Sequence, residues 1–189
     1  MVSRRSFLAA SAAYGLAALG ASATRAEPIL TEDGYYREPW FLESFLELAD
    51  DLKAAHEKGK RLAVMWELRG CPYCKETHLV NFAKPDVSNY IQQNFEILQL
   101  NIIGSREVTD FDGEKLSEKR LAQKYDVRYT PTIQFFPDST LGFKDKKPRE
   151  REITRVQGYI QPPNFLATFR FVAERAYEKR SLRDYLRSN

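Results

Sequence analysis

Two short apolar runs stand out along the chain, at residues 61–67 and 95–103. Each is rich in residues that favour strands and is of the length of a buried strand. The segment between them has helical character and is too long for a hairpin. A strand, a long helical crossover and a second strand predict a parallel pair in a right-handed βαβ unit.

The remaining segments alternate between helical and extended patterns. Apolar residues spaced by three or four positions predict a helix over residues 40–58, closed by Gly59. Further helices are expected at 75–83, 86–94, 117–125 and from Pro162 onward, with Asp86 and Ser117 as the caps of the second and third. The tail, residues 178–189, is expected to fray or to continue the last helix. Strands are expected at 133–136 and 150–159, a small hairpin pairing 106–109 with 114–116, and an ordered lead-in or loose arm at 27–39.

The only two cysteines, Cys71 and Cys74, lie between the first strand and the following helix. A two-residue gap is compatible with a reversible disulfide, half of a zinc site, or two unrelated buried thiols. Cys71 is expected in the first helical turn, where free N–H groups and the helix dipole stabilise an anion. Such a position lowers a thiol pKa from about 8.5 into a range of about 3.5–7.5. The pattern therefore indicates a redox site.

The N-terminus carries an export pattern. The pair Arg4-Arg5 precedes a weakly apolar run rich in alanine and glycine, and cleavage after Ala23 or Ala26 fits a small-x-small rule. We expect residues 1–26 to be a twin-arginine signal peptide and the mature protein to be periplasmic; the alternative is an uncleaved membrane anchor. Cleavage after Ala26 removes three arginines and no acid, which leaves 26 basic and 26 acidic residues. The balance gives no reason to expect a nucleic-acid partner.

Residues 27–189 are of a usual size for a single domain, with a core expected over about 40–176. An exported protein stapled by disulfides normally has several scattered pairs, whereas here one close pair stands alone. A disulfide closing so small a loop contributes little chain-entropy stabilisation. A chemical role for the pair is favoured over a structural one.

The order of elements, the CxxC motif and a later Thr130-Pro131 resemble the thioredoxin superfamily. Three stretches are more closely similar to the exported thioredoxins of the sulfur-oxidation system, SoxW: residues 67–78, 106–113 and 129–132. The resemblance covers about residues 40–172. It implies an α/β thioredoxin fold: a central mixed sheet flanked by helices, with an extra N-terminal helix and a loop or hairpin insertion at 104–116 before the cis-proline region.

The resemblance also implies roles for individual residues. Cys71 corresponds to the exposed nucleophile and Cys74 to the resolving thiol. Pro131 corresponds to the cis-proline, and Thr130 would offer its backbone to an extended substrate segment. Gly158 corresponds to a loop glycine that a substrate backbone can approach closely.

Some positions depart from a standard thioredoxin. Pro72 and Tyr73 fill the motif as in glutaredoxins and related oxidants. Both are expected to contact the substrate, with Tyr73 flanking the substrate groove. The buried aspartate of thioredoxins is missing from the first strand, so Glu67 is the candidate proton acceptor for Cys74. The alternative for Glu67 is a solvated acid at the strand end. His78 shares a helix face with both cysteines, either as an imidazolium near the thiolate or as a surface histidine.

A zinc site needs about four ligands. Besides the two cysteines the chain has only His78 and the distant His56. We therefore expect no metal.

The expected function is reduction of a disulfide on a periplasmic partner protein, through a Cys71–Cys74 dithiol cycle in sulfur oxidation. The expected electron donor is a membrane thiol transporter of the CcdA/DsbD kind, with no bound cofactor and a monomeric protein. Two alternatives stay open: a Dsb-like disulfide oxidase or isomerase, and a non-catalytic thioredoxin-like binding module. The polar excursion at 104–113 is the best candidate for an additional interaction surface.

Overall fold

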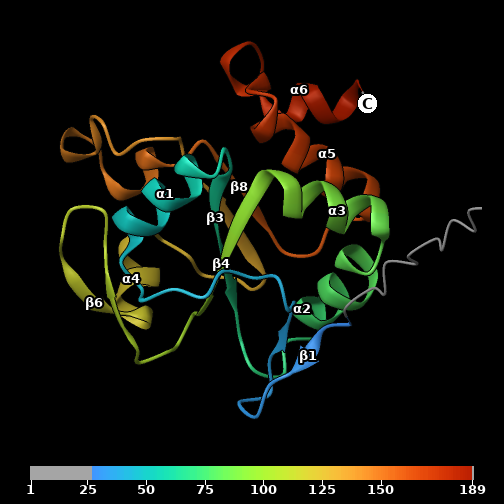
Figure 1. Ribbon diagram of the computed structural model, residues 1–189, viewed down its shortest axis with the longest axis horizontal. Helices are drawn as coiled ribbons and strands as arrows, with labels where there is room; N and C mark the ends of the chain where they lie inside the picture. The colour runs from blue at the N-terminus through green and yellow to red at the C-terminus, as the bar shows by residue number, and fades with distance from the viewer. Residues whose placement is uncertain (1–26, 189) are drawn as a thin grey trace, which may run out of the picture.

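A four-stranded mixed sheet forms the centre of the molecule in the computed structural model, which describes residues 27–188 (Figure 1). The expected signal peptide, residues 1–26, lies outside these residues. The strand order is β4-β3-β7-β8. The strands are β3 (Arg61–Glu67), β4 (Phe95–Asn101), β7 (Thr132–Phe135) and β8 (Thr154–Gln157). β3 and β4 are parallel and the other two pairings are antiparallel, which confirms the expected βαβ unit and mixed sheet.

Side chains of β3 alternate between two apolar clusters, as the period of a strand requires. Ala63 and Met65 belong to one cluster, together with α3 (Pro85–Asn94) and α5 (Pro162–Ala173). Val64 and Trp66 belong to the other, together with α1 (Leu48–Glu57) and α4 (Glu118–Lys124). Figure 1 shows α3 and α5 to the right of the sheet and α1 and α4 to its left. Because helices cover both faces, the interior strand reads as a continuous apolar run.

The helix expected over residues 40–58 is shorter than predicted. It begins only at Leu48, and Phe45 is 99% exposed instead of facing the core. The backbone of Leu46 has a φ of 65°, which no right-handed helix accommodates, and the amide of Leu42 donates to Ile97 O of β4 at 2.8 Å. Pairing with the sheet edge thus replaces helix formation in this stretch. Gly59, with a φ of 70°, follows the helix as expected.

The residues before α1 form an ordered arm, defined here as residues 29–42. It contains a small hairpin of β1 (Ile29–Leu30) and β2 (Tyr36–Arg37), which lies beside the short helix α2 (Pro72–Glu76) in Figure 1. A π-helical segment, η1 (Thr77–Phe82), continues from α2. The following helix starts at Pro85, so its cap is Lys84 and not Asp86, which lies in the first turn.

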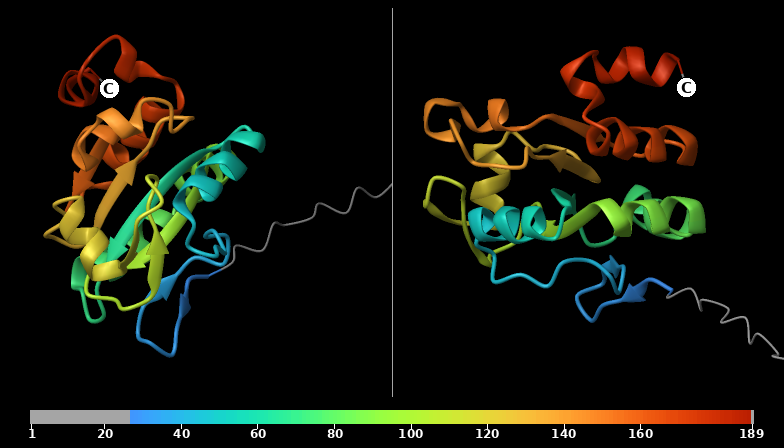
Figure 2. Two further views of the ribbon diagram at one scale, coloured as in Figure 1. Left: turned by 90° about the vertical axis from the view of Figure 1, so that its left-hand side faces the viewer. Right: turned by 45° about the horizontal axis from the view of Figure 1, so that its top comes forward.

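The excursion after β4 forms the expected hairpin, with β5 (Glu107–Thr109) paired to β6 (Lys115–Ser117). The Ser117 hydroxyl accepts a hydrogen bond from the Arg120 amide at 3.3 Å, which confirms the predicted cap of α4. Three 3-10 segments occur later in the chain, at η2 (Phe143–Asp145), η3 (Pro148–Arg151) and η4 (Ala176–Glu178). The tail neither frays nor continues α5. It turns back as a separate helix, α6 (Leu182–Arg187), stacked outside α5 (Figure 2).

Over the described residues, none of the helices has the length and apolarity needed to cross a membrane.

Candidate active site

Cys71 and Cys74 form a disulfide at the N-terminus of α2, with their Cα atoms 5.3 Å apart. Cys71 is the N-cap residue, and its Sγ accepts a hydrogen bond from the Cys74 amide at 3.1 Å. Pro72 occupies the first helical position, where its missing N–H costs nothing. Cys71 is half-buried and Cys74 is buried, at 5% exposure. The bond excludes the interpretation as two unrelated thiols, and Cys71 is the more exposed of the two residues.

The loop before β7 lies against the sulfur of Cys71. The Thr130 hydroxyl lies 3.4 Å from Cys71 Sγ and the Thr130 carbonyl oxygen 3.6 Å from it. The peptide bond from Thr130 to Pro131 is cis, and Pro131 is buried. The Gly158 amide donates to Pro131 O at 2.8 Å. The structure thus brings Cys71, Thr130, Pro131 and Gly158 together.

Two tyrosines are exposed in the segments that meet at the disulfide. Tyr73, within the motif, is 57% exposed and Tyr129, next to Thr130, is 64% exposed. Exposed aromatic side chains are frequent at recognition surfaces. Sequence reasoning named Tyr73 but not Tyr129, although its place beside Thr130-Pro131 was a usable signal.

Glu67 and His78 lie inside the molecule, so both surface interpretations of them are wrong. Glu67 is 1% and His78 0% exposed. His78 Nε2 lies 3.1 Å from Glu67 Oε1, and His78 Nδ1 lies 2.9 Å from Oε1 of Glu38, a residue of the N-terminal arm. Glu67 Oε2 accepts a hydrogen bond from the Gln99 side chain, which also donates to Tyr36 O at 2.7 Å. We call Glu38, His78 and Glu67 the buried trio.

The buried trio has a definite charge. Each ring nitrogen of His78 faces a carboxylate oxygen, so an imidazolium can donate to both. Burial by itself lowers the pKa of His78, but the hydrogen bonds and charges of Glu38 and Glu67 outweigh it and raise the pKa to about 9. One cation between two carboxylates leaves one net negative charge. Aromatic rings surround the imidazole, with centroids 5.7 Å away at Phe41 and 5.4 Å away at Phe82.

Glu67 is the expected proton acceptor for Cys74, but no hydrogen bond joins these two residues. Both carboxylate oxygens of Glu67 are occupied, one by His78 and one by Gln99. Sequence reasoning missed Glu38 and Gln99 altogether. Neither stands in a motif, and Glu38 is 40 residues from its partner His78.

A groove of about 570 Å³ opens between the arm and the carboxyl end of β4. Its wall includes Arg69, two residues before Cys71, together with Tyr35 and Arg37 of the arm. The arm therefore shapes the surface beside the redox motif as well as the interior below it.

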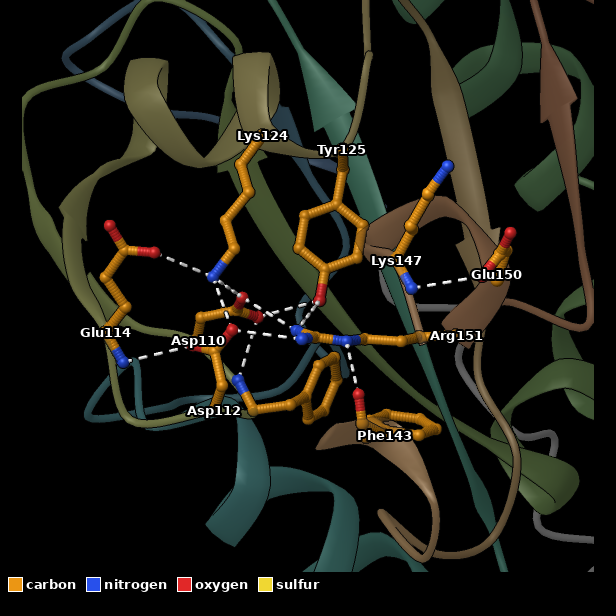
Figure 3. Close-up of polar contacts among 10 residues, drawn as sticks. Asp110, Asp112, Glu114, Lys124, Tyr125, Phe143, Lys147, Glu150 and Arg151 are labelled. Carbon is orange, nitrogen blue, oxygen red and sulfur yellow. Dashed lines mark hydrogen bonds and ion pairs between the residues drawn. The ribbon is translucent and has the colours of Figure 1, made fainter. Parts of the chain in front are cut away.

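A second polar cluster ties the inserted hairpin to the body of the protein (Figure 3). Asp110, fully buried, pairs with Arg151 at 3.1 Å and with Lys124 at 2.5 Å, and accepts a hydrogen bond from the Tyr125 hydroxyl at 2.8 Å. Partial burial raises the pKa of Asp112, yet hydrogen bonds from Lys124 and Arg151 prevail and lower it to about 2. These groups satisfy one another, so the cluster holds the hairpin in place.

Metal ligands do not gather in the described part of the chain, where no three His, Cys, Asp or Glu side chains are arranged to hold an ion. His56, the other histidine, is exposed on α1. The four residues considered for zinc are thus not assembled.

Comparison with known proteins gives one family. A family model described as a thioredoxin-like domain matches residues 48–173. Among solved structures, a thioredoxin-fold protein from Helicobacter pylori is 23% identical with a TM-score of 0.54, over 69% of this chain and 84% of that one. A putative disulphide-isomerase from Bacteroides thetaiotaomicron is 22% identical with a TM-score of 0.50, over 71% of this chain and 93% of that one. No curated protein sequence matches.

Proposed function

This chain belongs to the thioredoxin-like domain family, and we propose that it is a thiol–disulfide oxidoreductase that reduces a disulfide on a partner protein. The observation that carries the proposal is the placement of the cysteine pair. The reachable sulfur of Cys71 caps a helix N-terminus, while the second sulfur is buried behind it. A helix N-terminus stabilises a thiolate, and a thiolate is the attacking species in disulfide exchange.

The proposed cycle has two exchanges. The Cys71 thiolate attacks one sulfur of the partner disulfide, which forms a mixed disulfide and releases the other partner sulfur as a thiolate. The Cys74 thiol then loses its proton and attacks Cys71 Sγ, which closes the Cys71–Cys74 bond and releases the second partner sulfur. Two electrons pass to the partner. Of the two protons on the partner thiols, one comes from Cys74 and the other from the solvent, which took it up when Cys71 ionised.

Thr130 supplies the docking position for the partner in this scheme. Its carbonyl oxygen lies 3.6 Å from Cys71 Sγ, so a chain lying along residues 129–131 brings its disulfide to the nucleophile. Backbone pairing of this kind resembles the addition of a strand. Tyr73 and Tyr129 would contact the partner's side chains on either side.

The cellular setting extends the same proposal. The Arg4-Arg5 pair and the following apolar run support export to the periplasm, and the likeness of residues 106–113 to the SoxW thioredoxins supports a role in sulfur oxidation. The partner would be a disulfide or related oxidised cysteine on a sulfur-oxidation carrier protein. Because the periplasm is kept oxidising, electrons would come from a membrane thiol transporter of the CcdA/DsbD kind.

Trapping the mixed disulfide tests the core of this proposal. In the Cys74→Ser variant the second exchange is blocked, so we expect a stable adduct with the partner on a non-reducing gel, absent from Cys71→Ser. Purified wild-type protein, reduced beforehand, should also reduce insulin disulfides. Adducts on neither variant, together with no insulin reduction, would instead support the non-catalytic binding module.

A Dsb-like oxidase is the second candidate, and the Pro72-Tyr73 filling favours it. The two functions differ in the direction of electron flow. A glutathione titration of the Cys71–Cys74 couple separates them, because thioredoxin and DsbA lie at about −270 and −120 mV. A potential near the DsbA end would overturn the reductase assignment.

A further inference from the structure

A buried carboxylate from the N-terminal arm reaches the helix that carries the redox pair. Glu38 is 2% exposed and contacts His78, which follows Cys74 by four residues on the continuous α2–η1 segment. Four residues correspond to about 6 Å along a helix axis. Glu67, the third member of the buried trio, precedes Cys71 by four residues at the end of β3. The trio therefore approaches the disulfide from both of the segments that flank it.

The net charge of the trio does not depend on where its shared proton lies. An imidazolium between two carboxylates totals one negative charge, and so does a neutral imidazole beside one protonated and one ionised carboxyl. Among the described residues no lysine or arginine forms an ion pair with Glu38 or Glu67. The other polar partner is Gln99 of β4, which is neutral, and Lys75 lies over the outer Tyr36 ring at 5.9 Å. One negative charge therefore stays in the interior beside the redox pair.

We propose that Glu38 is a positioning residue for the redox pair. Through His78, and together with Glu67, it keeps one net negative charge about one helical turn from Cys74. This charge favours the disulfide over the thiolate form and makes the dithiol a stronger reductant. The benefit of a stronger reductant rests on the proposed disulfide-reductase function. The redox potential of the Cys71–Cys74 couple can be measured whether or not that function is correct.

The direction follows from charge alone. The disulfide is uncharged. In the reduced pair the N-terminus of α2 stabilises a thiolate on Cys71, and the second exchange passes through a thiolate on Cys74. A fixed negative charge in a poorly solvated interior raises the free energy of both thiolates and leaves the disulfide unaffected. At about 10 Å and an effective dielectric constant of about 20, one unit charge changes such an equilibrium about tenfold.

The Glu38→Gln variant keeps the shape of the side chain and removes its charge. We expect the equilibrium constant with glutathione to shift about tenfold toward the dithiol, which makes the potential about 30 mV less negative. The Cys71 thiolate should form at lower pH. Glu43→Gln is the matched control, because Glu43 follows the arm, its side chain is 89% exposed and it pairs with Arg37. The redox potential of the Glu43→Gln protein should equal that of the wild type. A folded Glu38→Gln protein in which nuclear magnetic resonance shows His78 protonated, but which has the wild-type potential or a more negative one, would overturn the proposal.

A second measurement needs no variant. If the trio and the thiolate interact, each must affect the other's protonation by the same free energy. Nuclear magnetic resonance of the His78 ring nitrogens in the wild type should therefore give a higher pKa in the reduced protein than in the oxidised one. Equal values in the two redox states would refute the coupling even if Glu38→Gln does not fold.

The redox potential of Glu38→Gln and the trapping with Cys74→Ser test the two proposals separately. A shifted potential in Glu38→Gln with no trapped partner on Cys74→Ser would keep this inference and reject the reductase. A trapped partner with an unshifted potential would do the reverse.

Discussion

The protonated state of His78 should make the protein lose stability as the pH rises above neutrality. His78 is fully buried between Glu38 and Glu67, with N···O distances of 2.9 and 3.1 Å. Despite the opposing effect of burial, these two carboxylates raise its pKa from 6.5 to about 9 in the folded protein. In the unfolded chain the histidine returns to about 6.5.

The sign follows from proton counting. Below about pH 6.5 both states bind the proton and the full stabilisation is present. Between about 6.5 and 9 only the folded state holds it, so the free energy of unfolding falls by about 1.4 kcal/mol per pH unit. The shift to about 9 therefore corresponds to about 3 kcal/mol, lost as the pH passes through that interval. This is a large part of the stability of an ordinary domain.

Urea unfolding of the oxidised protein at pH 6, 7, 8 and 9, followed by tryptophan fluorescence, measures this loss. Keeping the disulfide closed removes thiol titration from the same range. His78→Gln should be less stable than the wild type at pH 6 and should lose less stability between pH 6.5 and 9. His56→Gln, a change at the exposed histidine on α1, should retain the wild-type slope. A wild-type stability that is flat from pH 6.5 to 9, or an undiminished slope in His78→Gln, would refute the reasoning.

Three further substitutions, one of them a control, test the buried polar cluster and the packing at Gly104. Arg151→Met removes one of the cations that face the buried Asp110, and we expect a loss of about 2–4 kcal/mol, somewhat below the usual cost because another cation remains. Arg128→Ala, at an exposed pair, should cost less than about 1 kcal/mol, and equal costs in urea unfolding would contradict the role given to the cluster. Gly104→Ala places a Cβ 2.0 Å from Glu118 Oε2, so we expect about 1–3 kcal/mol of destabilisation. This should lower the melting temperature, and an unchanged melting temperature would show that the Glu118 carboxylate moves aside freely.

The parts of the fold that sequence reasoning predicted correctly are those in which local pattern and tertiary context agree. The strands at 61–67 and 95–101 are buried on both faces and therefore have continuous apolar sequences. The stretch 40–47 shows the opposite case. Its apolar spacing is helical, but a backbone hydrogen bond from Leu42 to Ile97 and the positive φ of Leu46 give it another structure. A helical period cannot reveal an available sheet edge.

The candidate site divides in the same way. The cysteines and the Thr130-Pro131 pair stand in short motifs, and the structure places the Thr130 hydroxyl 3.4 Å from Cys71 Sγ. The environment of Glu67 was not accessible from the sequence, because a carboxylate at a strand end looks the same whether it meets water or a buried imidazole. The difference depends on His78 and Gln99, which contact the carboxylate from positions 11 and 32 residues away along the chain.

Glu38 lies outside the part of the chain that matches the family model. That model begins at Leu48, so the disulfide and the Thr130-Pro131 loop lie inside the matched region. In β3, Met65 packs in an apolar cluster, so a buried charge does not enter the sheet there. It enters at the strand's end through Glu67, where an isolated carboxylate in the interior would be costly. His78 offsets that cost, and Glu38 then restores a net negative charge. A segment outside the recognised domain therefore supplies the group on which, by our proposal, the redox balance of the pair depends.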